Sequence, residues 1–259
     1  NPSAAAEELF YEGIDRLSNR SSRAVVIIAG NHDNPERLCA ATPLANKNGI
    51  ILLGYPGSDP GVLESESGDI AVVRSGAGWL ELNVCRCEHN AVIITLPYPS
   101  EARLDQLLTN DPDEKKIQMA YSDKIKDIFT SLSQNFRDDT VNLVVGHIFM
   151  RGGKESESER TLQVGGAMTV SPEALPLNAH YAALGHLHRP QQVKDAPCPA
   201  YYSGSPLAYS FSEADYSKAI YIVDAKPGCE TKIKEIYLSC GKPLKRWVAK
   251  NGIEQAIKW

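Results

Sequence analysis

The sequence predicts an α/β protein, a layered sandwich of sheets and helices that becomes rich in strands towards its C-terminal end. The run Ala24–Ala29 is continuously apolar, which is typical of a strand covered on both faces. Apolar residues between positions 117 and 132 recur every three or four residues, which predicts a long helix that packs along one face. Further short apolar runs after residue 140 predict additional strands.

The first predicted element is an amphipathic helix with Ser3 as its N-cap and with Leu9, Phe10, Ile14 and Leu17 on one face. A helix of this kind normally follows a strand in a βαβ unit. Because the sequence starts directly with this helix and without a methionine, we expect at least one strand upstream of Asn1.

A short second helix is predicted with Thr42 as its N-cap, Pro43 at its first position and Gly49 as its end. The Gly-rich turn 76–78 joins two of the later strands, and the long helix is expected over Pro112–Phe136. The predicted strands are residues 24–29, 50–53, 70–74, 80–84, 91–96, 141–145, 181–184, 201–203, 219–223 and 232–238.

The composition excludes several classes of protein. Of the 259 residues, 42% are hydrophobic and 23% are charged, as in soluble globular proteins rather than disordered or fibrous ones. No apolar run approaches the ~20 residues needed to span a bilayer, so we expect no membrane association. The net charge of −5 argues against a broadly basic nucleic-acid surface, although a local patch aided by metal ions remains compatible with DNA binding.

The six cysteines form no disulfide framework in a chain of this length, which favours a reducing, cytoplasmic location. We interpret Cys85 and Cys87 as alternate positions of a strand, with both thiols on one face. Together with His89 they offer an alternative, a soft-metal site, but zinc sites usually separate their cysteines by two to four residues. The charge-dense stretch 154–160 is expected to be an exposed loop.

Four of the six histidines follow predicted strands, each after an apolar run and a glycine: His32, His147, and the pair His186 and His188. Ligands of open α/β sheets collect outside the carboxyl ends of the strands, so we expect these termini to converge. We interpret the glycines as positions that let the backbone bend sharply away from each strand. His89 and His180 lack such companions, and a structural role is expected for both.

The spacing of His186 and His188 suits a two-metal site. In an extended chain, residues i and i+2 point the same way with Cα atoms ~6.5 Å apart, so each imidazole would reach one of two ions ~3.5–4 Å apart. The amide oxygen of Asn31 is a suitable neutral ligand. A single strand-end histidine is more often only a hydrogen-bonding residue; the repeated pattern is what favours the metal site.

The segments "GNHD", "GH" and "GHLH" together resemble the calcineurin-like metallophosphoesterase family. The longer stretches "GNHDNPERL", "RGGKESESERTLQVGG", "ALGHLHRPQ" and "YYSGSPLAYSFSE" are similar to the SbcD-type nuclease subunits within it. The resemblance runs from Pro2 to about Leu238. It implies a sandwich of two mixed sheets flanked by helices, with residues 1–240 forming the nuclease domain and residues 241–259 beginning a capping domain.

The resemblance also implies roles for the site residues. Asn31, His147 and His186 would bind one manganese-type ion and His188 a second, while His32 would orient or protonate the scissile phosphate. The implied reaction is metal-assisted hydrolysis of phosphodiesters at DNA ends, with 3′-exonuclease and single-strand endonuclease activity.

Asp33 is open to two interpretations: it caps the helix that begins near Pro35, which we favour, or it orients His32. Arg151, Lys154 and Arg189 lie near the expected site and would suit phosphates, although an ordinary solvated charge is the favoured interpretation of each.

The family also contains an Asp-x-His and a Gly-Asp-x-x-Asp motif, and neither occurs in this sequence. We expect both upstream of Asn1, and we expect this stretch of chain by itself to bind at most one ion and to be inactive. Two alternatives are a related phosphoesterase, acting on phosphomonoesters or cyclic nucleotides, and a non-catalytic scaffold.

The partners implied by the resemblance are DNA ends, an SbcC-type coiled-coil ATPase and a second copy of the chain. The homodimer would form through helices near residues 3–17 and 35–48. Leu9, Phe10 and Leu38 are candidates for that contact, and packing on the chain's own sheet is an equally favoured fate for them.

Overall fold

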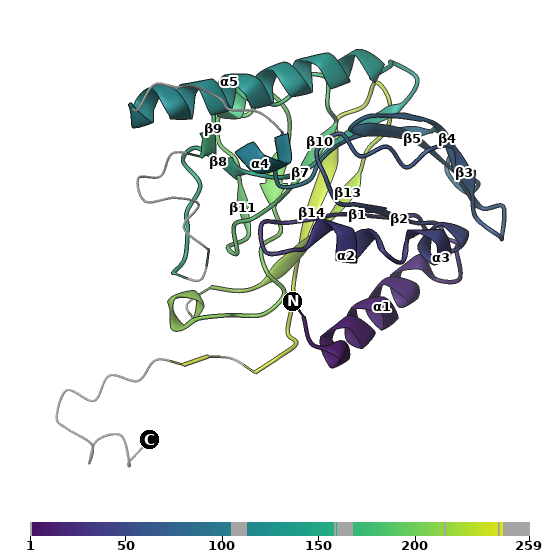
Figure 1. Cartoon of the computed structure of the whole chain (residues 1–259), viewed down its shortest axis with the longest axis horizontal. Coiled ribbons are helices and arrows are strands. Elements are labelled where there is room, and N and C mark those ends of the chain that lie inside the picture. The colour runs from purple at the N-terminus through teal and green to yellow at the C-terminus, as the bar shows by residue number, and fades with distance from the viewer. Residues whose placement is uncertain are drawn as a thin grey trace.

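The computed structural model describes residues 2–104, 113–157, 159, 168–214, 216–242 and 244–245. Its core is a four-layer sandwich, in which two sheets lie face to face between two layers of helices (Figure 1). The layered α/β architecture predicted from the sequence is thus confirmed. The outer helices on one side are α1 (Ala4–Ser18), α2 (Pro35–Cys39) and α3 (Thr42–Lys47), and the long helix on the other is α5 (Glu114–Leu132).

The smaller sheet of the sandwich is a parallel pair, β1 (Val25–Ile28) and β2 (Ile50–Leu53). Alternate side chains of β1 face opposite layers: Val26 and Ile28 pack towards the large sheet, and Val25 and Ile27 pack towards α1 to α3. The continuous apolar run in the sequence therefore reflects burial on both faces, as predicted.

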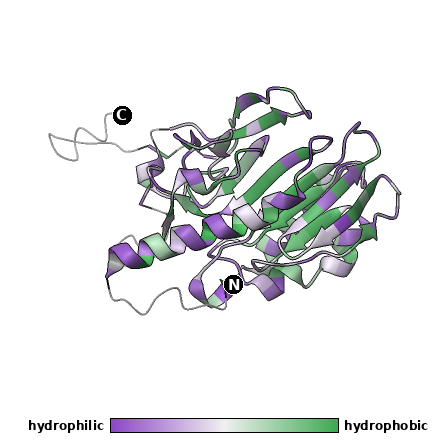
Figure 2. Cartoon of the chain, turned by 90° about the horizontal axis from the view of Figure 1, so that it is seen from above, coloured by the Kyte–Doolittle hydropathy of each residue, from purple (hydrophilic) through white to green (hydrophobic). Residues whose placement is uncertain are grey.

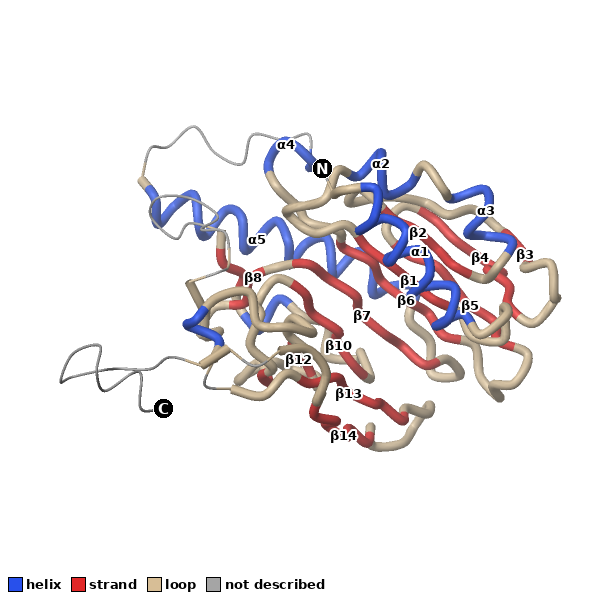
Figure 3. Tube along the Cα trace, turned by 90° about the horizontal axis from the view of Figure 1, so that it is seen from below, coloured by secondary structure: helices blue, strands red, loops and turns tan. Residues whose placement is uncertain are grey.

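The larger sheet is mixed and has the strand order β11-β12-β10-β7-β6-β5-β4-β3. Its centre is parallel, from β6 through β7 and β10 to β12, and its two ends are antiparallel. Figure 3 shows the neighbouring strands β7 and β10 in the middle of the molecule. All ten predicted strands are present. The strands of this sheet are β3 (Leu63–Glu64), β4 (Ile70–Gly76), β5 (Trp79–Val84), β6 (Ala91–Leu96), β7 (Val141–His147), β10 (Tyr181–Gly185), β11 (Gln191–Gln192) and β12 (Ala200–Tyr202).

Shorter elements complete the fold. A parallel pair, β8 and β9, and an antiparallel hairpin, β13 and β14, form separate sheets. Their bounds, with those of the helical turns, are β8 (Phe149–Met150), β9 (Thr169–Val170), β13 (Ala219–Asp224), β14 (Lys232–Tyr237), α4 (Glu101–Leu104), and 3-10 helices at Ser133–Asn135, Pro172–Ala174 and Phe211–Glu213. Among the described residues, no helix is long and apolar enough to cross a membrane.

Helix α5 packs on the large sheet through Tyr121, Ile125 and Phe129, which recur every four residues and are almost fully buried. Figure 2 shows hydrophobic strands beneath this helix, whereas the helix itself contains both hydrophilic and hydrophobic residues. Asp113 caps α5 through the backbone N–H of Lys115, and a 3-10 turn follows at Ser133. The predicted start at residue 112 lies outside the described residues.

The helix α1 is present as predicted; on the predicted face Ile14 is buried and Phe10 partly buried, whereas Leu9 and Leu17 are exposed. Two local predictions are wrong. The N-cap of α3 is Ala41, because Thr42 is already the first residue of the helix, and no side chain caps it. Cys85 and Cys87 lie in an exposed turn after β5, not on a strand face. All six cysteines are free, as expected.

The predicted boundary between a nuclease domain (1–240) and the start of a capping domain (241–259) stays a prediction, because most of the segment 241–259 lies outside the described residues. The contacts of Phe10 and Leu38 favour packing within the chain: both lie against the outer face of the β1–β2 pair. Leu9, with an exposed fraction of 69%, remains available for a contact between copies.

The buried Glu81 on β5 provides a test of how polar groups stabilise the large sheet. Its carboxylate accepts two hydrogen bonds from Arg137, both of 2.8 Å, and one from Asn90 of 2.9 Å. The Arg137 guanidinium lowers the pKa of Glu81 to about 2. We expect Glu81→Gln to lower the free energy of unfolding at pH 7 by about 2 kcal/mol, since a hydrogen bond to a charged group contributes ~1.5–3 kcal/mol.

The direction in which this contribution to the free energy of unfolding changes with pH follows from the lowered pKa. The contribution of Glu81 is present above the pKa of the unfolded chain, ~4.3, and is lost as the pH falls towards 2. Urea unfolding should therefore show the deficit of Glu81→Gln at pH 7 shrinking between pH 5 and pH 2. Glu66→Gln is the control, because Glu66 pairs with Lys47 at an exposed site and should change stability by less than about 0.5 kcal/mol.

Candidate active site

The five side chains that the sequence singles out line one cavity of about 230 Å³: Asn31, His32, His147, His186 and His188. They come from the carboxyl ends of β1, β7 and β10, which meet at one edge of the sandwich. In the parallel pairing of β10 with β7, Gly185 lies directly opposite His147. The predicted convergence of the strand ends is confirmed, while the roles assigned to these residues stay predictions.

His147 is the centre of the cluster. Its Nε2 lies 3.0 Å from Oδ1 of Asn31, and its ring lies edge-on to that of His186 at a centroid distance of 5.6 Å. The glycines on either side make room for this ring. A Cβ added at Gly30 or at Gly185 would lie only 2.8 Å from a ring atom of His147.

This packing corrects our interpretation of the glycines. Neither Gly30 nor Gly185 has a positive φ, so neither is required for a sharp bend. They are required because a side chain there would occupy the space of the His147 ring. Gly146, which occupies the same place in the sequence pattern, is different: a Cβ there would meet its nearest atom at an ordinary 3.7 Å.

His186 has a strained backbone. Its φ of +109° is a conformation that residues with a side chain rarely adopt, and it costs of order 1–3 kcal/mol. The chain therefore leaves β10 by a bend at His186, and the extended geometry that we assumed for residues 186–188 is wrong. Both rings nevertheless line the cavity, because the bend places them there. Such strain is typical of functional positions.

The turn after β1 is closed by Asp33. Its Oδ2 accepts a hydrogen bond of 2.7 Å from the backbone N–H of Gly30. The cap of α2 is the next residue, Asn34, whose Oδ1 accepts from the N–H of Arg37. Our preferred role for Asp33, helix capping, is therefore wrong, because the carboxylate satisfies the turn that carries Asn31 and His32.

Arg103, which no sequence motif indicated, braces the same turn from α4. Its two terminal nitrogens donate to the carbonyl oxygens of Gly30 and Asp33, at 3.0 and 2.8 Å. Its guanidinium lies over the ring of Tyr98, with 5.3 Å to the centroid. The sequence carries no signal of this role, because the contacts join segments about 70 residues apart in the chain.

Burial keeps two of the imidazoles neutral. It lowers the pKa of His147 to about 3, and it lowers the pKa of His186 to about 4 against an opposing contribution from Glu159. A neutral imidazole has a lone pair to offer, which is the form that binds metals. The electrostatic environment therefore suits ligand chemistry better than proton storage at these two positions.

The arrangement of Asn31 and His147 fits a metal ion in part. Their donor atoms, an amide oxygen and an imidazole nitrogen, are 3.0 Å apart, which matches two neighbouring ligands of an octahedral ion bound at ~2.1 Å. Asn31 Nδ2 is buried without a hydrogen-bond partner among the described residues, so only the oxygen of this amide is satisfied. Within the same residues, no three His, Cys, Asp or Glu side chains converge as a metal site.

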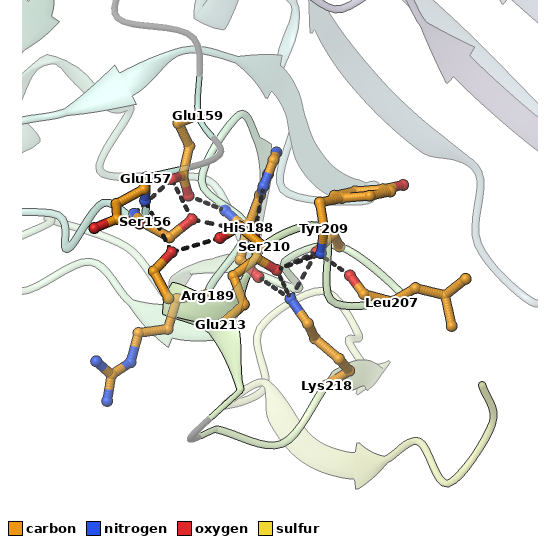
Figure 4. Close-up of polar contacts among 12 residues, drawn as sticks. Ser156, Glu157, Glu159, His188, Arg189, Leu207, Tyr209, Ser210, Glu213 and Lys218 are labelled. Carbon is orange, nitrogen blue, oxygen red and sulfur yellow. Dashed lines mark hydrogen bonds and ion pairs between the residues drawn. The ribbon is translucent and has the colours of Figure 1, made fainter. Parts of the chain in front are cut away.

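His188 is held by buried charged residues to which the sequence patterns gave no role. Its Nδ1 lies 3.0 Å from Oε1 of Glu213, and its backbone N–H donates to Oε1 of Glu159 at 2.7 Å (Figure 4). Glu213 comes from the "SFSE" stretch and Glu159 from the stretch expected to be exposed. Glu159 is in fact buried, with an exposed fraction of 9%, so that expectation is wrong for this residue.

The three basic residues near the site are exposed, in line with their favoured interpretation: Arg151, Lys154 and Arg189. Together they border a second cavity, of about 470 Å³. Arg151 lies 3.8 Å from Glu173, and Arg189 lies over the ring of Tyr216. His180 is structural, as expected, because its Nδ1 accepts a hydrogen bond from the N–H of Asn142.

Two comparisons bear on the family. The chain is 49% identical, over its whole length, to the SbcD subunit of the nuclease SbcCD from Bacillus subtilis, of which it spans 61%. It is 28% identical to the SbcD subunit of the nuclease SbcCD from Staphylococcus epidermidis, over 86% of this chain and 51% of that protein. No protein-family model matches. The mixed sheet flanked by helices is consistent with a calcineurin-like metallophosphoesterase fold, and along its whole length the chain is similar to an SbcD-type nuclease subunit.

Proposed function

We propose that this chain forms a portion of the catalytic domain of a metal-dependent nuclease that hydrolyses phosphodiester bonds at DNA ends. The observation that carries the proposal is the convergence of Asn31, His147, His186 and His188 on one cavity at the carboxyl ends of parallel strands. The two SbcD relatives, both named as parts of the nuclease SbcCD, support it. We further propose 3′-exonuclease and single-strand endonuclease activity, with Mn²⁺ as the metal.

In the proposed reaction, Asn31, His147 and His186 hold one ion and His188 helps to hold a second. Bound divalent ions would supply an activated water and offset the charge that develops on the phosphate. His32 is exposed and lines the same cavity, so it is placed to donate a proton to the phosphodiester or to stabilise its oxygens. Arg151, which is exposed and lines a separate cavity, would meet the DNA backbone away from the scissile bond.

The proposed partners are an SbcC-type coiled-coil ATPase and a second copy of the chain. The names of the relatives, which place them in SbcCD, support the ATPase partner. The exposed leucines Leu9 and Leu17 on α1 and Leu44 on α3 support a contact between copies through these helices.

The complete protein tests this function directly. With Mn²⁺ present, we expect it to degrade a blunt-ended DNA duplex and to leave p-nitrophenyl phosphate almost untouched, with activity lost on addition of EDTA. A protein that hydrolysed the small phosphomonoester faster than DNA would favour a phosphomonoesterase. A protein that bound Mn²⁺ but cleaved neither substrate would favour a scaffold.

A further inference from the structure

Glu213 is a buried carboxylate at the end of a 3-10 helix, with an exposed fraction of 1%. Its Oε2 accepts a hydrogen bond of 2.5 Å from the ammonium group of Lys218, which is itself buried. Oε2 also lies within hydrogen-bond distance of Ser205 Oγ and of the N–H of Tyr209. Glu213 is therefore a buried carboxylate paired with an ammonium group, and it contacts residues that line the cavity, among them Ser205 and Tyr209 (Figure 4).

A buried ion pair of this kind usually contributes little net stability to the folded state. The cost of removing two charges from water is often as large as their attraction, and apolar replacements of similar shape are frequently neutral or stabilising. The pair therefore calls for another explanation, which its remaining contacts provide.

Those contacts meet at His188. Glu213 Oε1 lies 3.0 Å from the Nδ1 of the His188 ring, and Lys218 Nζ donates to the His188 carbonyl oxygen at 3.2 Å. Glu159 accepts the backbone N–H of the same residue at 2.7 Å. Three buried charged side chains thus hold the ring, the carbonyl and the N–H of one histidine, and the ring of Tyr209 packs edge-on against the imidazole at 5.3 Å.

The chemistry of the Glu213 contact determines the tautomer. A carboxylate accepts hydrogen bonds and donates none, so Nδ1 must carry the proton and donate it to Oε1. In a neutral imidazole the lone pair is then on Nε2. A histidine whose second nitrogen donates to a carboxylate is the arrangement found around metal-binding imidazoles, where it fixes the ring and raises the basicity of the ligand atom.

We infer that Glu213, held in place by Lys218, is a positioning residue that sets the tautomer and orientation of His188 for binding a divalent cation. The inference rests on the proposed function, in which His188 is a metal ligand. It assigns to the "SFSE" stretch a role in the site, as the source of the carboxylate behind one ligand.

The test is the variant Glu213→Gln in the complete protein. A glutamine can present either its oxygen or its amide nitrogen to Nδ1, so it no longer dictates the tautomer. In the metal-free wild type, ¹⁵N NMR of the His188 ring should show Nδ1 protonated and Nε2 unprotonated. In Glu213→Gln we expect a mixture of tautomers and a Kd for Mn²⁺, measured by electron paramagnetic resonance, raised about 10- to 100-fold.

Two further variants separate positioning from folding. Glu213→Gln leaves Lys218 buried without its carboxylate, so the double variant Glu213→Gln/Lys218→Met removes both charges and should show the same tautomer mixture and weakened Mn²⁺ binding in a stably folded protein. Glu81→Gln removes a different buried glutamate, paired with Arg137 away from the cavity, and should leave Mn²⁺ affinity within twofold of wild type.

An unchanged His188 tautomer, with Mn²⁺ affinity within twofold of wild type in the folded double variant, would overturn the inference. The NMR readout needs neither metal nor DNA, so the two proposals fail separately. If the wild type cleaves no DNA while the tautomer depends on Glu213, only the proposed function is wrong. If the wild type cleaves DNA and the tautomer ignores Glu213, only the positioning role is wrong.

Discussion

Replacing Gly185 with alanine is expected to lower the Mn²⁺-dependent rate of DNA cleavage about a hundredfold while leaving the protein folded. The added Cβ would lie 2.8 Å from Nδ1 of His147, closer than such atoms approach one another. The His147 ring would have to move, and its Nε2 would lose its place 3.0 Å from Asn31 Oδ1. A displacement of ~1 Å at a reacting centre is enough for a loss of ~10²-fold.

The chain contains the matched control. Gly146 also stands between an apolar strand and a histidine, but its added Cβ would make only an ordinary contact with Leu184 at 3.7 Å. Gly146→Ala should therefore retain at least half of the wild-type rate, whereas Gly30→Ala should behave like Gly185→Ala, because its Cβ meets the same ring. Equal losses in all three variants, measured on protein with unchanged thermal stability, would contradict this explanation of the glycines.

The convergence of the candidate site could be predicted in part from the sequence because it depends mainly on topology. The parallel neighbours β7 and β10 end at the same edge of the large sheet, so the histidines that follow them must lie close together. The strand β1 belongs to the smaller sheet, and Asn31 and His32 reach the same edge because the two sheets lie face to face. Asn31 and His147 are 116 positions apart in the chain and still make a hydrogen bond. The predicted convergence did not require the correct local geometry, because both histidine rings line the cavity even though residues 186–188 are not extended as assumed.

The supporting contacts could not be predicted, because they depend on tertiary packing. Asp33 and Asn34 are adjacent residues of similar capping ability, and only the backbone path decides which of them caps α2. Glu213 reaches His188 across 25 residues, and Arg103 reaches the turn at Gly30 across 73. Side chains of these types are usually solvated at the surface, so composition and periodicity give no signal of their burial.

Replacing His32 with asparagine is expected to separate catalysis from metal binding. His32 is exposed at the cavity, while its neighbour Asn31 is partly buried with its oxygen on His147. We expect His32→Asn to reduce the rate of DNA cleavage by ~10²- to 10⁴-fold, the range contributed by a positioned general acid, and to change the Kd for Mn²⁺ by less than twofold. Single-turnover cleavage assays and Mn²⁺ titrations of the complete protein measure the two effects.

The adjacent variant Asn31→Ala provides the contrast, because it removes an expected ligand oxygen and should weaken Mn²⁺ binding at least tenfold. If His32→Asn weakened Mn²⁺ binding as much as Asn31→Ala does, His32 would be a ligand and not a proton donor. If the rate of DNA cleavage by His32→Asn stayed within threefold of wild type, a group other than His32 would donate the proton to the phosphodiester. The exposed position of His32 makes both results unexpected, since a ligand is normally shielded and a group that meets the substrate must be accessible.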